Sequence, residues 1–325
     1  MKKILVTGAG GFIGSNLVRA LLQDKNYELI LTYKNDLGYD FSALCDSANK
    51  PPIFYDLDIM DRESVFDIFK NQKIDTCVHL AAEVNVEDSI KYPDKTMDVN
   101  VKGTINVLDA CSHNHIENFL FASSAAVYGH PTKLPITEEH QLAPISPYGI
   151  SKLLAEKQVS SYMNSKKIRN TISLRIFNAY GEGQSGNVSV ITKFARSLSS
   201  GLAPIIHGNG RQKRDFISID DVVSAILLSI RAMENRSDRL LSAPSLIFNI
   251  GTGVATSVRD LCDQMIKLSG LDLRPIYKEG NNEADISASC ADITKAKNIL
   301  DFSPKTDLTL DLEKIISSMV TTQLK

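Results

Sequence analysis

The first half of the chain alternates short apolar segments with amphipathic ones, at intervals of about thirty residues. Short, buried, β-branched segments predict parallel strands at Lys3–Thr7, Tyr27–Thr32, Ile53–Tyr55, Thr76–Leu80, Phe119–Ser123 and Thr171–Ile176. The segments between them predict helices at Asn16–Leu22, Arg62–Lys70, Val99–His113 and Tyr148–Ser165. This alternation predicts an α/β fold: a Rossmann-type, doubly wound parallel sheet with helices on both faces.

After Tyr180 the pattern changes. A polar loop is followed by predicted helices, short strands and a second polar loop, and the tail from Ser257 is mainly helical: loop Glu182–Asn187, helix Val190–Ser199, strand Pro204–His207, helix Asp220–Ala232, loop Glu234–Ser242 and strand Phe248–Ile250. We therefore predict a doubly wound domain over 1–180, whose ligand the motifs below indicate, and a smaller C-terminal mixed α/β lobe over 181–325. A strand near 246–250 is expected to return to the first sheet.

Composition narrows the class of partner. The chain has 325 residues and a net charge of −2, with 43% apolar and 23% charged residues, so nothing favours nucleic acid or an anionic membrane. No apolar stretch is long enough to span a bilayer, and the apolar start breaks at Gly8. The five cysteines are scattered without metal-ligand spacing, which favours reduced thiols in a cytoplasm and no metal site.

Three glycines follow the first predicted strand at intervals of three, at Gly8, Gly11 and Gly14, and lead into a helix. In this context one glycine allows a tight turn, one lets the backbone approach a pyrophosphate, and one lets the helix pack on the strand. The free N–H groups of the helix would then bind the anion. The turn therefore predicts dinucleotide binding.

The end of the second strand leaves the choice of dinucleotide open. An acidic residue there would bind a ribose 2′-hydroxyl and favour NAD, but the chain has Thr32 and Lys34. A hydroxyl and a cation suit the 2′-phosphate of NADP. Lys34 is equally well explained as a solvated surface lysine.

A tyrosine and a lysine four residues apart, Tyr148 and Lys152, begin a predicted helix. Both side chains would lie on one helix face, where the ammonium would favour the phenolate and lower the tyrosine pKa. Ser123 and Ser124 end a predicted strand, where open α/β sheets place ligand contacts. Because these residues come after a dinucleotide-binding turn in the chain, they predict proton transfer to or from a substrate oxygen.

With these motifs in place the chain resembles the extended short-chain dehydrogenase/reductase superfamily, and within it the NAD-dependent epimerase/dehydratase family that includes nucleotide-sugar 4-epimerases. The resemblance runs almost end to end. It rests on Gly8–Gly14, Asp58-Ile59, His79–Ala82, Asn100–Thr104, Ser123–Gly129, Tyr148–Lys152, Arg175–Asn178, Arg214–Ile217 and Asn249–Gly251.

The resemblance implies roles for individual residues. The catalytic residues would be Ser124, Tyr148 and Lys152. The cofactor would be bound by Gly8, Gly11, Phe12, Ile13, Gly14, Thr32, Lys34, Asp58, Ile59, Leu80, Ala81, Ala82, Asn100, Ser123, Tyr148 and Lys152. The substrate would be bound by Ser124, Asn178, Val188, His207, Arg214, Asp285 and Ser289.

The chain departs from the family pattern on the substrate side. Arg214 matches the family's diphosphate-binding arginine, although it could instead form a surface ion pair with Asp215. A second diphosphate-binding arginine is often found where this chain has Asn282, and Arg211 or Lys213 could replace its charge.

Two further positions bear on the sugar nucleotide. His207 stands where relatives place an aromatic residue against the uracil. The small Ser289 stands where a tyrosine would exclude a 2-acetamido group, so we expect N-acetylated UDP-hexoses to be accepted as well as plain ones.

The residues after the strand-end serines distinguish reactions. Dehydratases carry Asp-Glu nearby, whereas this chain has Ala125-Ala126 and lacks that general acid. We therefore expect C4 epimerisation of a UDP-hexose or UDP-N-acetylhexosamine with bound NAD. NADP-dependent reduction of a nucleotide-linked 4-keto-deoxysugar is the alternative, and a non-catalytic dinucleotide sensor is a third. By analogy, the helices at Val99–His113 and Tyr148–Ser165 predict a homodimer.

Overall fold

The computed structural model describes residues 1–35, 50–184, 189–243, 245–279 and 286–323. Its centre is a seven-stranded sheet in which all neighbouring strands run parallel, in the order β10-β6-β5-β4-β1-β2-β3. The strands are β1 (Lys2–Thr7), β2 (Tyr27–Tyr33), β3 (Ile53–Asp56), β4 (Thr76–His79), β5 (Asn118–Ser124), β6 (Asn170–Ile176) and β10 (Ile247–Ile250). The predicted doubly wound sheet is confirmed, including the returning strand near 246–250.

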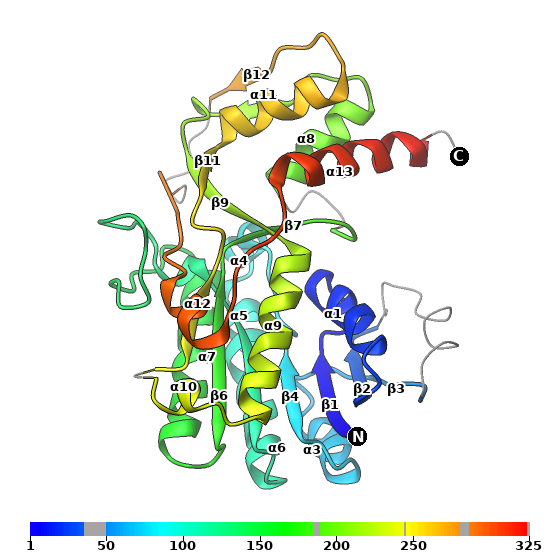
Figure 1. The fold of residues 1–325 in the computed structure, drawn as a ribbon, viewed down its shortest axis with the longest axis vertical. Helices are drawn as coiled ribbons and strands as arrows, with labels where there is room; N and C mark the ends of the chain where they lie inside the picture. The colour runs from blue at the N-terminus through cyan, green and yellow to red at the C-terminus, as the bar shows by residue number, and fades with distance from the viewer. Residues whose placement is uncertain (36–49, 185–188, 244, 280–285, 324–325) are drawn as a thin grey trace.

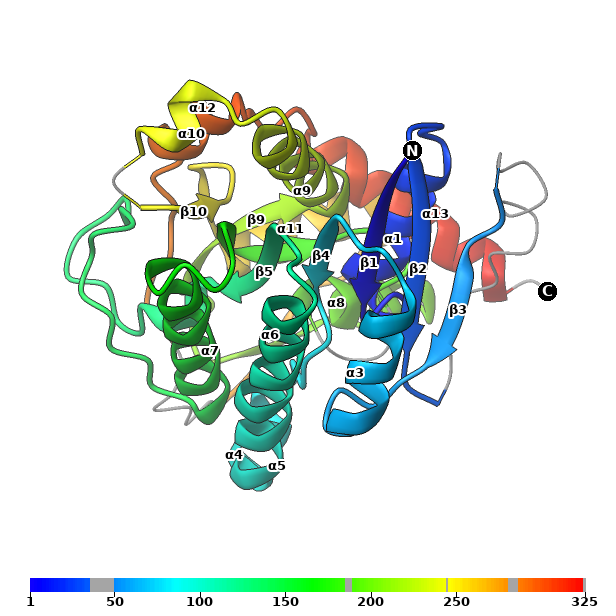
Figure 2. The same cartoon turned by 90° about the horizontal axis from the view of Figure 1, so that it is seen from below.

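Helices cover both faces of this sheet (Figure 2). One face carries α1 (Phe12–Leu22), α9 (Ile219–Glu234) and α12 (Thr294–Leu300), and the other carries α3 (Arg62–Asn71), α6 (Thr104–His113) and α7 (Pro147–Asn164). Each face has its own apolar core, because strands buried on both sides contribute side chains alternately to the two faces. The strand order changes direction between β1 and β4, which is where such sheets bind ligands.

A smaller layer lies beyond the carboxyl ends of these strands (Figure 1). It contains a three-stranded sheet of β7 (Asn178–Tyr180), β9 (Lys213–Ser218) and β11 (Ala255–Ser257), and a two-stranded sheet of β8 (Ile205–His207) and β12 (Ile276–Lys278). Helices α8 (Val190–Ser199), α11 (Val258–Ser269) and α13 (Leu308–Gln323) pack together around a third apolar core.

The chain passes between the two layers more often than the sequence pattern suggested. The strand β7 already belongs to the small layer, and α9 returns to the large sheet, where it packs against β5, β6 and α1. The division at residue 180 stays a prediction.

Some local elements differ from those expected. The predicted helix over Val99–His113 is a π-helical segment, Asp98–Gly103, followed by α6. Gly103 lies against Ile59 there, and a Cβ on Gly103 would come within 2.6 Å of the Ile59 Cδ1 atom. Two short helices, α4 (Val86–Lys91) and α5 (Pro93–Met97), precede it, and α10 (Asp238–Leu241) lies in the expected polar loop. In the described ranges, no helix is long and apolar enough to cross a membrane.

Candidate active site

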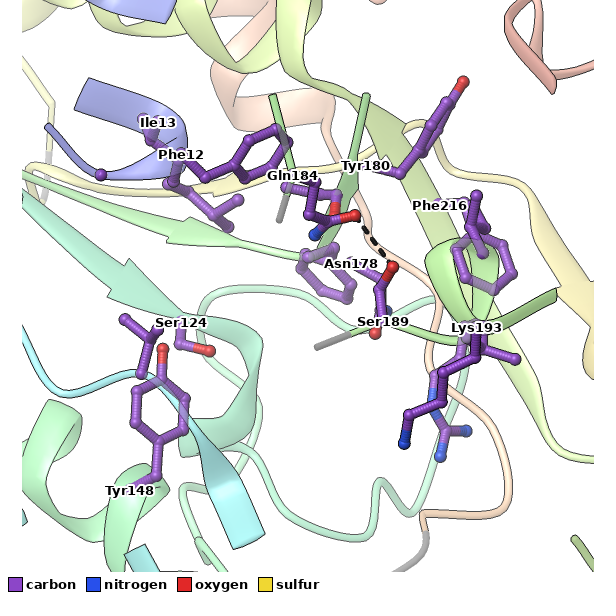
Figure 3. A pocket seen from close by; sticks show the side chains of 18 of the residues that line it. Phe12, Ile13, Ser124, Tyr148, Asn178, Tyr180, Gln184, Ser189, Lys193 and Phe216 are labelled. Atoms are coloured by element: carbon purple, nitrogen blue, oxygen red, sulfur yellow. Dashed lines mark hydrogen bonds between the residues drawn. The ribbon is translucent and has the colours of Figure 1, made fainter. Parts of the chain in front are cut away.

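A cavity of about 1220 Å³ separates the large sheet from the small layer. Residues at the carboxyl ends of β1, β4, β5 and β6 line one side, and residues of α8, β8 and β9 line the other. Figure 3 shows Tyr148 and Ser124 facing Lys193 and Phe216 across this space. Its volume exceeds that of a typical single-ligand pocket, so there is room for two ligands side by side.

The predicted glycine turn forms one end of the cavity. Gly8 has a φ of +70°, and a Cβ there would come within 2.8 Å of the Ala81 backbone nitrogen. A Cβ on Gly14 would collide with the Gly8 carbonyl oxygen, whereas one on Gly11 would lie 3.3 Å from it. Gly8 and Gly14 are therefore required by the fold, whereas a Cβ on Gly11 would make one tight contact, with the Gly8 carbonyl oxygen.

Helix α1 begins at this turn without a side-chain cap on its free N–H groups. Its first residues line the cavity together with Leu80, Ala81 and Ala82, which follow β4. Uncapped N–H groups and the helix dipole favour an anion at this position. The turn therefore fits the pyrophosphate of a dinucleotide.

Tyr148 and Ser124 meet at the centre of the cavity. Ser124 ends β5, where its Oγ accepts a hydrogen bond of 3.1 Å from the Ala126 backbone N–H. Tyr148 lies in the first turn of α7, which Ser146 caps through the Gly149 N–H. The Tyr148 hydroxyl points toward Ser124 (Figure 3). Burial raises the pKa of Tyr148 above its ordinary value, and a hydrogen bond with Ser124 opposes this only in part.

Lys152 lies one helical turn after Tyr148 and lines the same cavity. Its ammonium donates to the Ala122 carbonyl at 2.9 Å and lies 5.0 Å from the centre of the Phe121 ring. Burial lowers the Lys152 pKa to about 8. The predicted catalytic set, Ser124, Tyr148 and Lys152, is thus brought together at one point.

A buried hydrogen-bond chain connects the glycine turn to the tyrosine helix. The Thr104 hydroxyl donates to the Asn100 carbonyl at 2.6 Å, so His79 must donate to Thr104 from Nε2, at 3.0 Å. The His79 Nδ1 atom then accepts from the Thr7 hydroxyl at 2.7 Å, and Thr7 accepts from the Leu80 and Ala81 N–H groups. Burial, with a smaller effect of Lys152, lowers the His79 pKa to about 3, so the ring is neutral.

Asn100 continues this chain, and it lies outside the residues that line the cavity. Its amide bonds both the N–H and the carbonyl of Glu83, and it donates to the Ser151 hydroxyl at 2.9 Å. Ser151 in turn donates to the Tyr148 carbonyl at 2.8 Å. In this structure Asn100, which the family resemblance assigned to the cofactor, contacts protein groups that position the cavity wall.

Ser123 lines the cavity, but its hydroxyl is directed at a buried ion pair behind the wall. It donates to Glu156 Oε2 at 2.7 Å, and Arg175 binds both oxygens of the same carboxylate at 3.0 and 2.6 Å. Arg175 also donates to the Tyr128 hydroxyl and to the Glu138 carbonyl, both at 2.9 Å. This network links the carboxyl ends of β5 and β6 next to Ser124 and so holds them in place.

Four residues predicted to contact the adenosine end of the cofactor lie beside the cavity and outside its lining: Thr32, Lys34, Asp58 and Ile59. Thr32 is 1% exposed, and its backbone carbonyl accepts from the Ala9 N–H at 2.9 Å. The Lys34 ammonium lies 2.6 Å from the Asp58 carboxylate, so this positive charge already has a counter-ion. Their contacts with a cofactor stay predictions.

On the substrate side, Asn178, His207 and Arg214 line the cavity as predicted. Asp215 has no exposed surface, and its carboxylate accepts from Thr252, Gly253 and Ala291, so the structure offers no support for an Arg214–Asp215 ion pair. Ser289 is 6% exposed and lies outside the lining residues. Val188, Asp285 and Asn282 fall outside the residues that the structure describes.

Of the cations that the sequence suggested for the substrate side, Arg214 lines the cavity, and two cations that it did not suggest line it as well. Arg211 and Lys213 are exposed and lie outside the cavity lining, whereas Lys193 and Arg196 of α8 line it. Among the described lining residues, four are cationic (Lys152, Lys193, Arg196 and Arg214) and none is acidic. The cavity is therefore suited to strongly anionic ligands.

The fold and this cavity define an α/β enzyme with a dinucleotide turn beside a Tyr–Lys pair. Residues 4–251 match the NAD dependent epimerase/dehydratase family, and the chain belongs to that family. A putative UDP-glucose 4-epimerase from Methanocaldococcus jannaschii is 35% identical, over 97% of this chain and 98% of the relative. The predicted family is confirmed.

Two solved structures extend this similarity to the whole fold. UDP-glucose 4-epimerase from Thermotoga maritima, solved with UDP-glucose, has a TM-score of 0.87 and 30% identity, and the match covers 99% of this chain and 100% of that chain. UDP-N-acetylglucosamine 4-epimerase from Methanobrevibacter ruminantium, solved with UDP-N-acetylmuramic acid, has a TM-score of 0.84 and 27% identity, with 99% of both chains covered. These relatives favour the epimerase prediction over the reductase.

Proposed function

We propose that the chain interconverts the C4 epimers of a UDP-linked hexose, with NAD as a permanently bound cofactor. The observation that carries this proposal is the common cavity. Ser124, Tyr148 and Lys152 lie between a glycine turn suited to one pyrophosphate and a cationic wall suited to another. Relatives that act on UDP-glucose and on UDP-N-acetylglucosamine support the choice of substrate class.

The residues of the turn fit NAD. Gly8 and Gly14 leave no room for a Cβ, and the uncapped start of α1 offers N–H groups to a pyrophosphate. When bound, NAD supplies a nicotinamide that takes the hydride from C4 of the sugar and gives it back. Because the net redox change is zero, the enzyme needs no exchange of cofactor during turnover.

Tyr148 performs the proton transfer. Its phenolate takes the proton of the sugar 4-hydroxyl as the C4–H bond breaks, and Ser124 donates a hydrogen bond to the same oxygen. A positive charge near the ring favours the phenolate, and in the substrate complex we assign this role to the Lys152 ammonium. After the 4-keto sugar has turned over in the cavity, Tyr148 returns the proton to the same oxygen.

The charge near the second strand supports NAD rather than NADP. Lys34 is the cation that would attract a 2′-phosphate, and it lies 2.6 Å from Asp58. A 2′-phosphate would have to compete with that carboxylate and would be repelled by it. This favours the epimerase over the NADP-dependent reductase.

We further propose a homodimer that works in a reducing cytoplasm. Helix α4 packs against α7, and both expose apolar side chains: Val86, Ile90, Ile150 and Leu154 are 37–56% exposed. Burial of such side chains against a second copy would stabilise a dimer. Cysteines 77, 111, 262 and 290 are free thiols, which fits a reducing compartment.

Two measurements test the function. Denaturing the purified protein should release NAD, identified by its mass, at nearly one equivalent per chain. The native protein should convert UDP-glucose to UDP-galactose without added cofactor. An empty protein that reduces a nucleotide-linked 4-keto sugar with NADPH would overturn the proposal in favour of the reductase.

A further inference from the structure

The cationic residues of the cavity are divided between its two ends. Lys152 lies with the catalytic residues, whereas Arg214 of β9 and Lys193 and Arg196 of α8 belong to the small layer. In Figure 3, Lys193 lies across the open space from Tyr148 and from the glycine-turn residues Phe12 and Ile13. These three cations therefore face a part of the cavity that the cofactor pyrophosphate, at the start of α1, does not neutralise.

Helix α8 presents these groups through its own periodicity. Its apolar residues Ile191, Phe194, Ala195 and Leu198 are buried in the core of the small layer. The opposite stripe, Lys193, Arg196, Ser197 and Ser200, follows the same helical spacing and lines the cavity. The packing of α8 thus fixes which face meets the ligand.

Lys193 also has a partner in the large layer, outside the cavity lining. Its ammonium lies 3.8 Å from a carboxylate oxygen of Glu87 in α4, and the two side chains are 50% and 72% exposed. An ion pair this long and this exposed is weak, because water screens it and the side-chain entropy opposes it. An anion in the cavity can therefore displace Glu87 from Lys193 at little cost.

We propose that Lys193 and Arg196, together with Arg214, bind the diphosphate of the nucleotide sugar, and that Lys193 exchanges Glu87 for a phosphate oxygen when the substrate binds. This assignment rests on the proposed function. It places the second positive charge of the diphosphate site on α8, whereas the sequence suggested Arg211 or Lys213.

The test is calorimetric titration of the NAD-loaded protein with UDP, comparing Lys193→Met and Arg196→Met with the wild type. Methionine keeps most of each apolar stem and removes the charge. Lys213→Met is the matched control, because Lys213 is an exposed cation next to Arg214 that lies outside the cavity lining. Each α8 variant should weaken UDP binding about tenfold or more, as expected for a charge-assisted hydrogen bond, and the control should change it less than about twofold.

A double-mutant cycle tests the exchange of partners. Glu87→Gln should strengthen UDP binding about two- to threefold in the wild-type background and have no effect in Lys193→Met. Equal effects of Glu87→Gln in both backgrounds would overturn the exchange. If wild type binds UDP but both α8 variants bind it like Lys213→Met, the assignment of Lys193 and Arg196 is wrong. If the wild type binds no UDP, the proposed function itself fails.

Discussion

Replacing Glu156 by glutamine should lower the free energy of unfolding by about 3–5 kcal/mol. The Glu156 and Arg175 side chains are 3% and 2% exposed, and the carboxylate accepts from Arg175 Nε, Arg175 Nη2 and Ser123 Oγ. A glutamine keeps the volume but has an oxygen at only one of the two positions that the carboxylate oxygens occupy. At the other position its amide N–H group faces an Arg175 N–H, and the guanidinium remains buried without its counter-charge.

Urea unfolding followed by circular dichroism at one fixed NAD concentration measures this loss, since the stabilisation by NAD cancels between proteins that bind it with equal affinity. Glu117→Gln is the matched control. Glu117 pairs with Arg169 at 3.3 Å and with Arg236 at 3.4 Å, but all three side chains are 51–53% exposed, so the loss should stay below about 1 kcal/mol. If Glu156→Gln costs no more than Glu117→Gln, burial does not set the strength of this ion pair and the reasoning is wrong.

Three further predictions concern the cavity. Tyr148→Phe should remove nearly all epimerase activity while NAD content stays unchanged; a variant that keeps a third of the wild-type rate would show that another group transfers the proton. Burial lowers the Lys152 pKa from 10.5 to about 8. Between these two pH values, the Lys152 side chain is protonated in the unfolded chain and neutral in the cofactor-free folded protein. The stability of wild type relative to Lys152→Met should therefore rise between pH 8 and 10.5, by up to about 3 kcal/mol, in urea titrations; a flat difference would contradict the burial argument. Gly11→Ala should release its NAD at a small cost in stability, because its Cβ meets the Gly8 carbonyl oxygen at 3.3 Å. Gly14→Ala should unfold at clearly lower urea, because its Cβ would collide with that oxygen; similar stability losses in both would refute the separate roles.

The large sheet could be predicted because its signal is local. Each strand such as Lys2–Thr7 is a short apolar segment, and each crossover helix has its own apolar stripe. In the small layer, the predicted helix Val190–Ser199 and strand Pro204–His207 are also found, as α8 and β8, but the three-stranded sheet could not be predicted in the same way. Strand β9 begins Lys213-Arg214-Asp215, and its partners β7 and β11 are three-residue strands brought together only by the fold.

The same distinction applies to the site. The glycine turn and the Tyr148–Lys152 pair are recognisable because local geometry fixes the spacing of their residues. Lys193 and Arg196 carry no such signal, since the polar stripe of an amphipathic helix is the same whether it meets solvent or a cavity. Asn100 and Ser123 are the reverse case, because their motifs are recognisable in the sequence but their contacts are not. Only the tertiary structure shows that their side chains bind protein groups.

The two sides of the cavity differ in how firmly they are built, and this difference suits epimerisation. On the catalytic side, neutral buried hydrogen bonds through Thr7, His79 and Asn100 fix the backbone around Ala81 and Tyr148 before any ligand arrives. Such preorganisation keeps the proton acceptor in place for both directions of transfer. On the substrate side, the cations of α8 are long, exposed side chains that can follow a moving phosphate. A keto sugar that must present its second face needs a fixed reaction centre and a tether at a distance from it. A diphosphate bound as proposed at α8 and β9 would supply that tether without restraining the sugar ring.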